Sequence, residues 1–97
     1  MHARVISLLV KEGKLDDLVT LLDDDILPEA HQQPGFHHAA LLTDARTGTC
    51  ILISYWESEE AMVASRASGF YDRQIAKMRD LMLGYPVAHH YHVRMDE

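Results

Sequence analysis

The stretch TGTCILISYWESEEAMVA, residues 47–64, decides the fold because it combines a turn, a strand and the start of a helix. Thr49–Trp56 is rich in β-branched and aromatic residues, and the glycine just before it supplies a turn. Ser58 is a suitable N-cap, since its hydroxyl can accept a free backbone N–H of the first helical turn. Glu59 and Glu60 then place negative charge at the positive end of the helix dipole. These features predict a strand-to-helix junction directly after the tryptophan.

The rest of the chain alternates between apolar strand segments and amphipathic helical segments. Further strands are predicted for Ala3–Val10, Phe36–Thr43 and Val87–Met95. Helices are predicted from Lys14 to about His31, with a kink or a new short turn at Pro28, and from Glu59 to Gly84, with an interruption near Ser68-Gly69. The order strand, helix, strand, strand, helix, strand is typical of a ferredoxin-like α+β fold. Such a fold has a four-stranded antiparallel sheet with both helices on one face.

Both faces of the predicted sheet carry apolar side chains. In the strand Thr49–Trp56, for example, Cys50 and Leu52 alternate with Ile51 and Ile53. If the helices cover only one face, the other remains open, and an exposed apolar face marks an interaction surface. We therefore predict a homodimer in which two sheets pack face to face.

Size and charge limit the function classes. A chain of 97 residues is predicted to form one domain over residues 1–97. The net charge is −6 and the nine Lys and Arg residues are scattered, which argues against a nucleic-acid partner. The apolar run near the amino terminus is too short to span a bilayer, so no membrane partner is expected. The single cysteine, Cys50, fits the reducing cytoplasm.

Four short motifs resemble the antibiotic biosynthesis monooxygenase domain family, and the resemblance covers nearly the whole chain. They are Pro34-Gly35-Phe36, Leu41-Leu42-Thr43-Asp44, Thr47-Gly48 and Trp56-Glu57-Ser58-Glu59-Glu60-Ala61. The resemblance implies a dimeric α+β barrel, in agreement with the strand and helix pattern. It does not select one activity, because this fold hosts several chemistries.

Two activities of the family can be compared with this chain residue by residue. Its quinone-forming members oxidise polycyclic phenols with O₂ and need neither metal nor flavin. Their corner tryptophan matches Trp56, whereas their tyrosine falls at Met62 and their asparagine at Leu52. In haem-degrading members, the tryptophan and the iron-ligating histidine of the second helix fall at Ser65 and Ile75. Because isoleucine cannot ligate iron, haem degradation is disfavoured.

The candidate site is predicted around a cavity between sheet and helices. The candidate catalytic residues are Trp56, Tyr71 and His90, and the candidate substrate-binding residues are Tyr55, Met62, Arg66 and Tyr91. Arg66 and Lys77 could meet an anionic substrate at the mouth of this cavity. The alternative for Trp56 is a structural plug at the strand-helix corner. The alternative for both basic residues is an ordinary solvated position on a helix.

Histidines are frequent, with seven in the chain. His90 and His92 share one strand face, a spacing that could present two imidazoles to a metal. A third ligand would be needed, and His2 could supply it only if the first and last strands are neighbours. Exposed or interface histidines are the simpler interpretation, so we predict no metal and no cofactor.

Two functions follow from these observations. The first is a cofactor-independent monooxygenase that acts on a hydrophobic aromatic metabolite. The alternative is a non-catalytic dimer that binds a small ligand or has a structural role, which the polar partners missing at Leu52 and Met62 favour.

Overall fold

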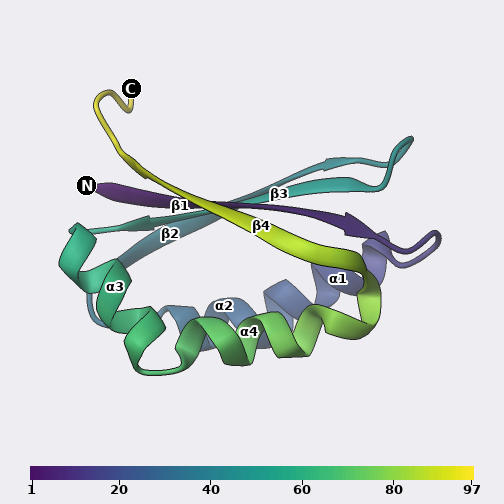
Figure 1. The fold of residues 1–97 in the computed structure, drawn as a ribbon, viewed down its shortest axis with the longest axis horizontal. Helices are drawn as coiled ribbons and strands as arrows, with labels where there is room; N and C mark the ends of the chain where they lie inside the picture. Colours follow the sequence, from purple (N-terminus) through teal and green to yellow (C-terminus); the bar gives the residue numbers. More distant parts are fainter.

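The computed structural model describes residues 1–97 as a four-stranded antiparallel sheet with every helix on one face (Figure 1). The strands are β1 (His2–Val10), β2 (Phe36–Asp44), β3 (Thr49–Trp56) and β4 (Met82–His92). Their order across the sheet is β2-β3-β1-β4, so β1 and β3 are central and β2 and β4 are the edges. This arrangement confirms the predicted ferredoxin-like fold.

The first helical segment is continuous from Leu15 to Ala30 but contains one wider turn. It consists of α1 (Leu15–Leu21), the π-helical turn η1 (Leu22–Ile26) and α2 (Leu27–Ala30). Pro28 lies in the first turn of α2, where its missing N–H leaves one helical hydrogen bond unmade and its ring crowds the preceding turn. The sequence predicted a kink or a new short turn at Pro28, and the short helix α2 begins beside it, directly after the π-helical turn.

The second helical segment follows the junction that the sequence predicted. The Ser58 hydroxyl accepts a hydrogen bond from the backbone N–H of Ala61 at 3.1 Å and caps α3 (Glu59–Ala67). Gly69 then adopts a left-handed conformation (φ +88°) and separates α3 from α4 (Phe70–Met78). A short 3₁₀ turn, η2 (Arg79–Leu81), leads into β4. No helix is long and apolar enough to cross a membrane.

The predicted boundary between the last helix and the last strand is wrong. Met82 fits the helical spacing of the preceding apolar residues, yet it is the first residue of β4 and pairs with Val10. Gly84 does not end a helix, because it lies within the strand where the pairing with β1 shifts register. The strand also includes Pro86 and ends at His92, not Met95. A proline is tolerated here because β4 is an edge strand.

Buried side chains fill the space between the sheet and the helices. The larger cluster joins β1 to both helical segments and consists of Ile6, Leu8, Val10, Leu18, Leu22, Ile26, Cys50, Tyr71, Met78 and Met82. The smaller cluster lies at the end of the sheet near α3 and consists of Ala30, Trp56, Met62 and Phe70. The candidate site described below lies where these two clusters meet.

The opposite face of the sheet has no helix over it (Figure 1). Several large apolar side chains of this face are about half exposed: Leu9, Leu42, Leu83, Val87 and Tyr91. We call this surface the open face, and the surface under the helices the covered face.

Candidate functional site

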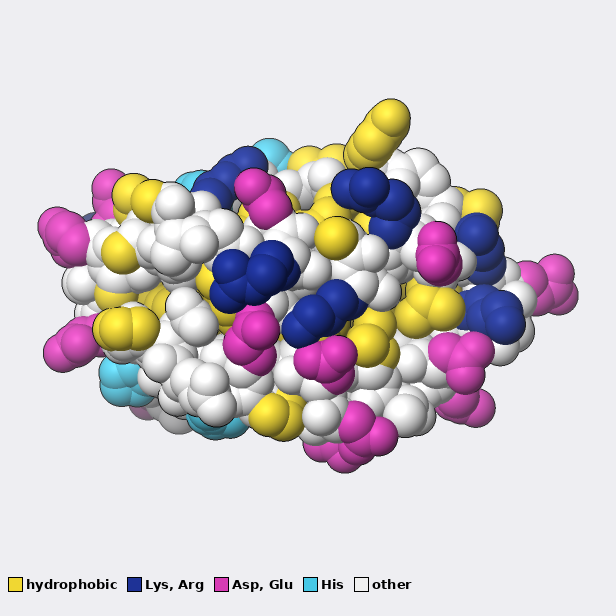
Figure 2. Space-filling model, turned by 90° about the horizontal axis from the view of Figure 1, so that it is seen from below, with side chains coloured by type: hydrophobic (Ala, Val, Ile, Leu, Met, Phe, Trp, Pro, Cys, Tyr) yellow, Lys and Arg dark blue, Asp and Glu magenta, His cyan; other side chains and the backbone are white.

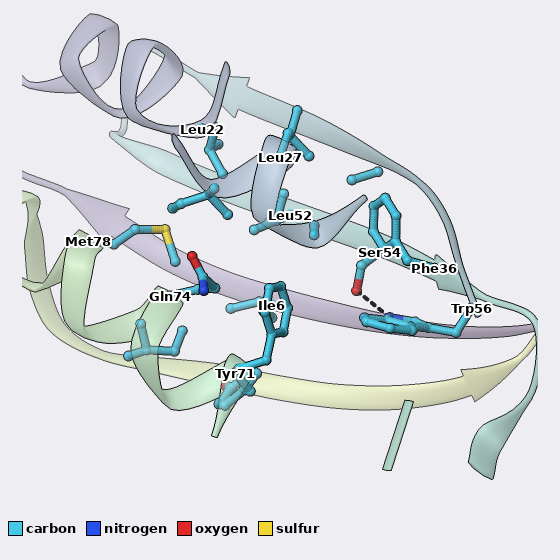
Figure 3. A pocket seen from close by; sticks show the side chains of 15 residues that line it. Ile6, Leu22, Leu27, Phe36, Leu52, Ser54, Trp56, Tyr71, Gln74 and Met78 are labelled. Carbon is cyan, nitrogen blue, oxygen red and sulfur yellow. Dashed lines mark hydrogen bonds between the residues drawn. The ribbon is translucent and has the colours of Figure 1, made fainter. Parts of the chain in front are cut away.

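A small apolar cavity lies between the covered face and the two helical segments (Figure 3). Its volume is about 50 Å³. It is lined by Ile6, Leu22, Ile26, Leu27, Ala30, Phe36, Ala39, Leu52, Ser54, Trp56, Phe70, Tyr71, Gln74, Ile75 and Met78. The sheet forms its roof, η1 and α2 form one wall, and α4 forms the other.

Aromatic rings form one end of the cavity. Trp56 is 1% exposed and meets Phe36 edge-on, with ring centroids 5.3 Å apart. Phe70 makes a second edge-on contact with Trp56, with ring centroids 6.3 Å apart. Trp56 therefore combines the two locations predicted for it, since it packs the strand-helix corner and also lines the cavity.

Few polar groups reach the cavity, and none of them is a carboxylate or an imidazole. Ser54 Oγ accepts a hydrogen bond from Trp56 Nε1 at 3.0 Å (Figure 3), and its own hydroxyl proton remains available for a ligand. Gln74 donates to the Glu29 carboxylate and accepts from Lys77 Nζ, so its amide is held in place. Tyr71 is the third lining residue that carries a polar group. The cavity can thus offer hydrogen bonds from neutral groups.

Ion pairs tie the two helical segments together outside the cavity. Arg73 and Lys77 of α4 lie 3.5 Å and 3.7 Å from Glu29, and Lys77 also lies 2.9 Å from Asp25. Figure 2 shows basic and acidic side chains next to each other across the middle of this helical surface. We call these three pairs the helix strap.

A surface groove of about 350 Å³ runs between the first helical segment and the edge strand β2. It shares Leu22, Leu27, Ala39 and Leu52 with the cavity lining. These four side chains therefore form the wall between the cavity and the groove.

The predicted site residues do not all meet at this cavity. Trp56 and Tyr71 line it, whereas Met62, Arg66 and His90 line a separate hollow beside α3. Lys77, predicted at the mouth, is held in the helix strap.

Tyr55 and Tyr91 are not cavity residues, contrary to the prediction. They are aligned with each other across Ala3 on the open face, because neighbouring residues of a strand point to opposite faces. Tyr55 stacks on His38 there, with ring centroids 4.3 Å apart. Substrate contact through these tyrosines would have to occur on the other side of the sheet.

Arg4 is the polar residue that the sequence analysis missed. It is only 2% exposed, and its Nη2 donates to the Met62 carbonyl at 3.0 Å and to Ser65 Oγ at 3.2 Å. Its guanidinium lies 4.7 Å from the ring centroid of Tyr71. Burial, with a contribution from the nearby charge of Arg66, lowers the pKa of Arg4 to about 10. The sequence contained one indication of this buried position: Arg4 and Ile6 are two residues apart in an apolar strand, so they lie on the same face.

The histidines do not form a metal centre. No group of three His, Cys, Asp or Glu side chains is close enough to hold a metal ion. β1 and β4 are neighbours, as a third ligand from His2 would require, but Arg4 lies opposite His90. Burial, and then the positive charges of Arg4 and Arg66, lower the pKa of His90. The same charges would repel a cation.

Comparison with known proteins identifies the family. The model of the family described as antibiotic biosynthesis monooxygenase matches residues 1–77. This chain belongs to the antibiotic biosynthesis monooxygenase family. An uncharacterised protein of Mycobacterium tuberculosis strain H37Rv is 30% identical to it over 80 residues, which are 82% of this chain and 33% of that protein. The chain therefore spans about a third of the length of the curated relatives it matches.

Solved structures of a monooxygenase and of a cofactor-independent oxygenase share the fold of this chain. One is a monooxygenase from the ActVA-Orf6 gene of Streptomyces coelicolor, in complex with nanaomycin D. It has a TM-score of 0.74 and 21% identity, and the match covers 99% of this chain and 89% of that one. Another is SnoaB, a cofactor-independent oxygenase from Streptomyces nogalater, with a TM-score of 0.76, 18% identity and coverage of 98% and 94%. At these identities the similarity establishes the fold.

Proposed function

We propose that this chain is a cofactor-independent monooxygenase whose substrate is a hydrophobic aromatic molecule bound in the cavity between sheet and helices. The observation that carries the proposal is the ring-lined cavity, in which Phe36, Trp56, Phe70 and Tyr71 surround a space with few, neutral polar groups. Apolar pockets with a small number of placed polar groups are the usual form of small-ligand sites. Membership of the monooxygenase family supports the same reaction class.

The reaction class needs no external reductant. In an anthrone-type substrate, a ring CH₂ loses a proton to give an anion, and this anion transfers electrons to O₂. The CH₂ carbon becomes C=O, and the second oxygen atom leaves as water, so R₂CH₂ + O₂ gives R₂C=O + H₂O. The residues of this chain would stack on the substrate through Trp56 and donate hydrogen bonds to its oxyanion from Ser54 or Tyr71.

The cavity has to widen before such a substrate fits. Sites for drug-sized ligands have volumes of about 300–1,000 Å³, whereas this cavity has about 50 Å³. The shared wall of Leu22, Leu27, Ala39 and Leu52 is the shortest way to join it to the groove of about 350 Å³. Leu22 belongs to the π-turn η1, and such turns often occur at functional sites. We propose that η1 moves outward to admit the substrate.

The functional unit proposed here is a homodimer joined through the open faces. Leu42 and Val87 on this face are both 53% exposed, and Tyr91 is 54% exposed. Side chains of this kind on an uncovered sheet favour contact with a second sheet. Burial of the open face would also place Tyr55 and Tyr91 in the interface.

Oxygen uptake with anthrone as substrate tests the enzyme proposal. We expect uptake above the protein-free rate, lower by about tenfold in Ser54→Ala and Trp56→Phe if each removes one interaction with the transition state. Tyr91→Phe, on the open face, is the matched control and should retain wild-type uptake. If wild type does not exceed the protein-free rate with any anthrone or quinol, the proposal fails.

A non-catalytic ligand-binding protein is the second candidate. The observation that favours it is that the cavity lining contains no carboxylate and no imidazole that could act as a base near neutral pH. The chain contains one tryptophan, which lies in the cavity wall, so its fluorescence reports directly on occupancy. Saturable quenching of Trp56 by anthraquinone without oxygen uptake from anthrone would favour this candidate.

A further inference from the structure

A second concave site lies beside α3, outside the aromatic cavity. This hollow has a volume of about 290 Å³ and is lined by Arg4, Met62, Val63, Arg66, Ala67 and His90. Tyr71 separates it from the cavity, because Tyr71 lines the cavity and both guanidinium groups lie over its ring, at 4.7 Å and 4.6 Å. The hollow and the cavity are therefore neighbours with different chemistry.

The charge at the hollow is unbalanced. Arg4 is almost fully buried, and neither Arg4 nor Arg66 forms an ion pair with a carboxylate. Arg4 Nε has no hydrogen-bond partner at all. Buried charges are normally paired, since removing a lone charge from water is costly. Glu59 is the carboxylate whose charge acts on His90, and it lies 3.8 Å from His2.

The hydrogen-bonding needs of the groups around Arg4 do not depend on it. The Met62 carbonyl accepts a hydrogen bond from Ser65 Oγ at 2.6 Å as well as from Arg4. Loss of Arg4 would therefore leave this carbonyl with a partner. A buried cation that no carboxylate balances and no neighbour depends on indicates a ligand.

We propose that the hollow binds a small carboxylate with a short apolar body. Arg4 and Arg66 both belong to the lining, and a planar guanidinium group matches the two oxygens of a carboxylate. Met62, Val63 and Ala67 supply apolar contacts for the rest of the molecule. The oxygen reaction and the aromatic cavity play no part in this binding.

Titration calorimetry with sodium benzoate at constant low ionic strength tests the proposal, with neutral benzamide as the matched control ligand. We expect saturable benzoate binding and no comparable benzamide binding. Arg66→Gln should weaken benzoate binding about tenfold, because a charge-assisted contact is lost. Arg79→Gln, on the exposed surface after α4, is the control variant and should bind as wild type does.

Arg4→Met provides a second variant. It should fold with at least wild-type thermal stability and lose benzoate binding, because it replaces an unbalanced buried charge with an unbranched apolar side chain. Benzoate should also raise the pKa of His90 in a histidine NMR titration, since a bound anion offsets the charges of Arg4 and Arg66.

The proposal is overturned by any of three results. Benzoate and benzamide could bind equally well, Arg66→Gln and Arg79→Gln could have the same affinity, or phosphate could bind more tightly than benzoate. The last result would indicate a general anion site without a role for the apolar wall.

Discussion

The two faces of the sheet have similar apolar content but different surroundings. On the covered face, Ile6, Leu8 and Cys50 are at most 5% exposed under the helices, whereas Leu42 and Val87 on the open face are 53% exposed. Alternation along a strand assigns each residue to a face, but it does not say which face the helices cover. That choice comes from the two crossover connections, whose shared handedness brings both helical segments to one side.

The informative residues on each face are those that depart from this shared apolar character. The covered face includes the buried Arg4, the half-buried Ser54 and the exposed His90, and these polar groups mark the cavity and the hollow. The open face is apolar over most of its central area, which suits association. Chemistry is therefore expected on one side of the sheet and assembly on the other.

The largest expected difference is in the stability lost when one of two adjacent residues on opposite faces is replaced by alanine. Trp56→Ala removes a side chain that is 1% exposed, so we expect the free energy of unfolding to fall by about 3–5 kcal/mol. Tyr55→Ala, one position earlier on the open face, should cost less than half as much. Urea denaturation of both variants at the same dilute protein concentration measures the difference. Equal losses would mean that the two faces are equally buried in solution.

A charge placed on the open face should act on assembly. We expect Leu42→Glu to raise the dimer dissociation constant by at least about tenfold, because the carboxylate would be desolvated between two sheets. Val63→Glu is the matched control, since Val63 on α3 is 54% exposed but does not lie on the sheet. Sedimentation equilibrium measures both constants. If both variants dissociate to the same degree, the open face is not the interface.

Loosening the helix strap should have a smaller effect on the covered side. Glu29→Gln removes the ion pairs with Arg73 and Lys77, and partly exposed pairs contribute up to about 1 kcal/mol. We expect a small loss of thermal stability that shrinks in high salt, together with faster quenching of Trp56 by an apolar ligand. Asp17→Asn, which breaks an exposed pair with Lys14, should leave the quenching rate unchanged.

Acid pH should produce the smallest effect, through His90. Its folded-state pKa lies below the ordinary 6.5, because burial and the charges of Arg4, Arg66 and His2 oppose protonation while Glu59 favours it. The unfolded chain therefore takes up the proton first. The contribution of neutral His90 to stability is fully present above pH 6.5 and is lost as the pH decreases through the lower folded pKa.

Thermal unfolding of His90→Asn between pH 7 and about pH 5 tests this expectation, since histidines titrate in this range. The variant should lose less stability than wild type on acidification. His89→Asn, on the other side of β4, is the control. If His90→Asn lost as much stability on acidification as wild type does, another group would be responsible for the pH dependence.

Most of the fold could be predicted from local signals. Ser58, Gly69 and the β-branched strand Thr49–Trp56 each determine a local structure by their own chemistry, and all three appear as predicted. The start of β4 could not be found this way. Met82 has helical spacing and faces the same core, so periodicity does not distinguish the end of the helix from the first residue of the strand.

The candidate site was less predictable, because it depends on contacts between distant parts of the chain. Trp56 and Tyr71 were expected at the cavity and are found there. Tyr55 and Tyr91 were also expected there, but the alternation of side chains along their strands places them on the open face. Arg4 meets Met62 and Ser65 only after the first strand packs beside α3. No motif around Arg4 indicates that contact in advance.

The π-turn η1 has a consequence for how ligand preference could change in this family. A π-turn closes its hydrogen bonds five residues apart where an α-helix closes them four apart, so η1 holds one residue that a regular helix would not. Deleting one aspartate of Asp23–Asp25 would restore regular spacing while α1 and α2 keep their orientation over the sheet. The wall between cavity and groove would then be one residue shorter. Length variation at this single turn could therefore reshape the cavity without any substitution among its lining residues.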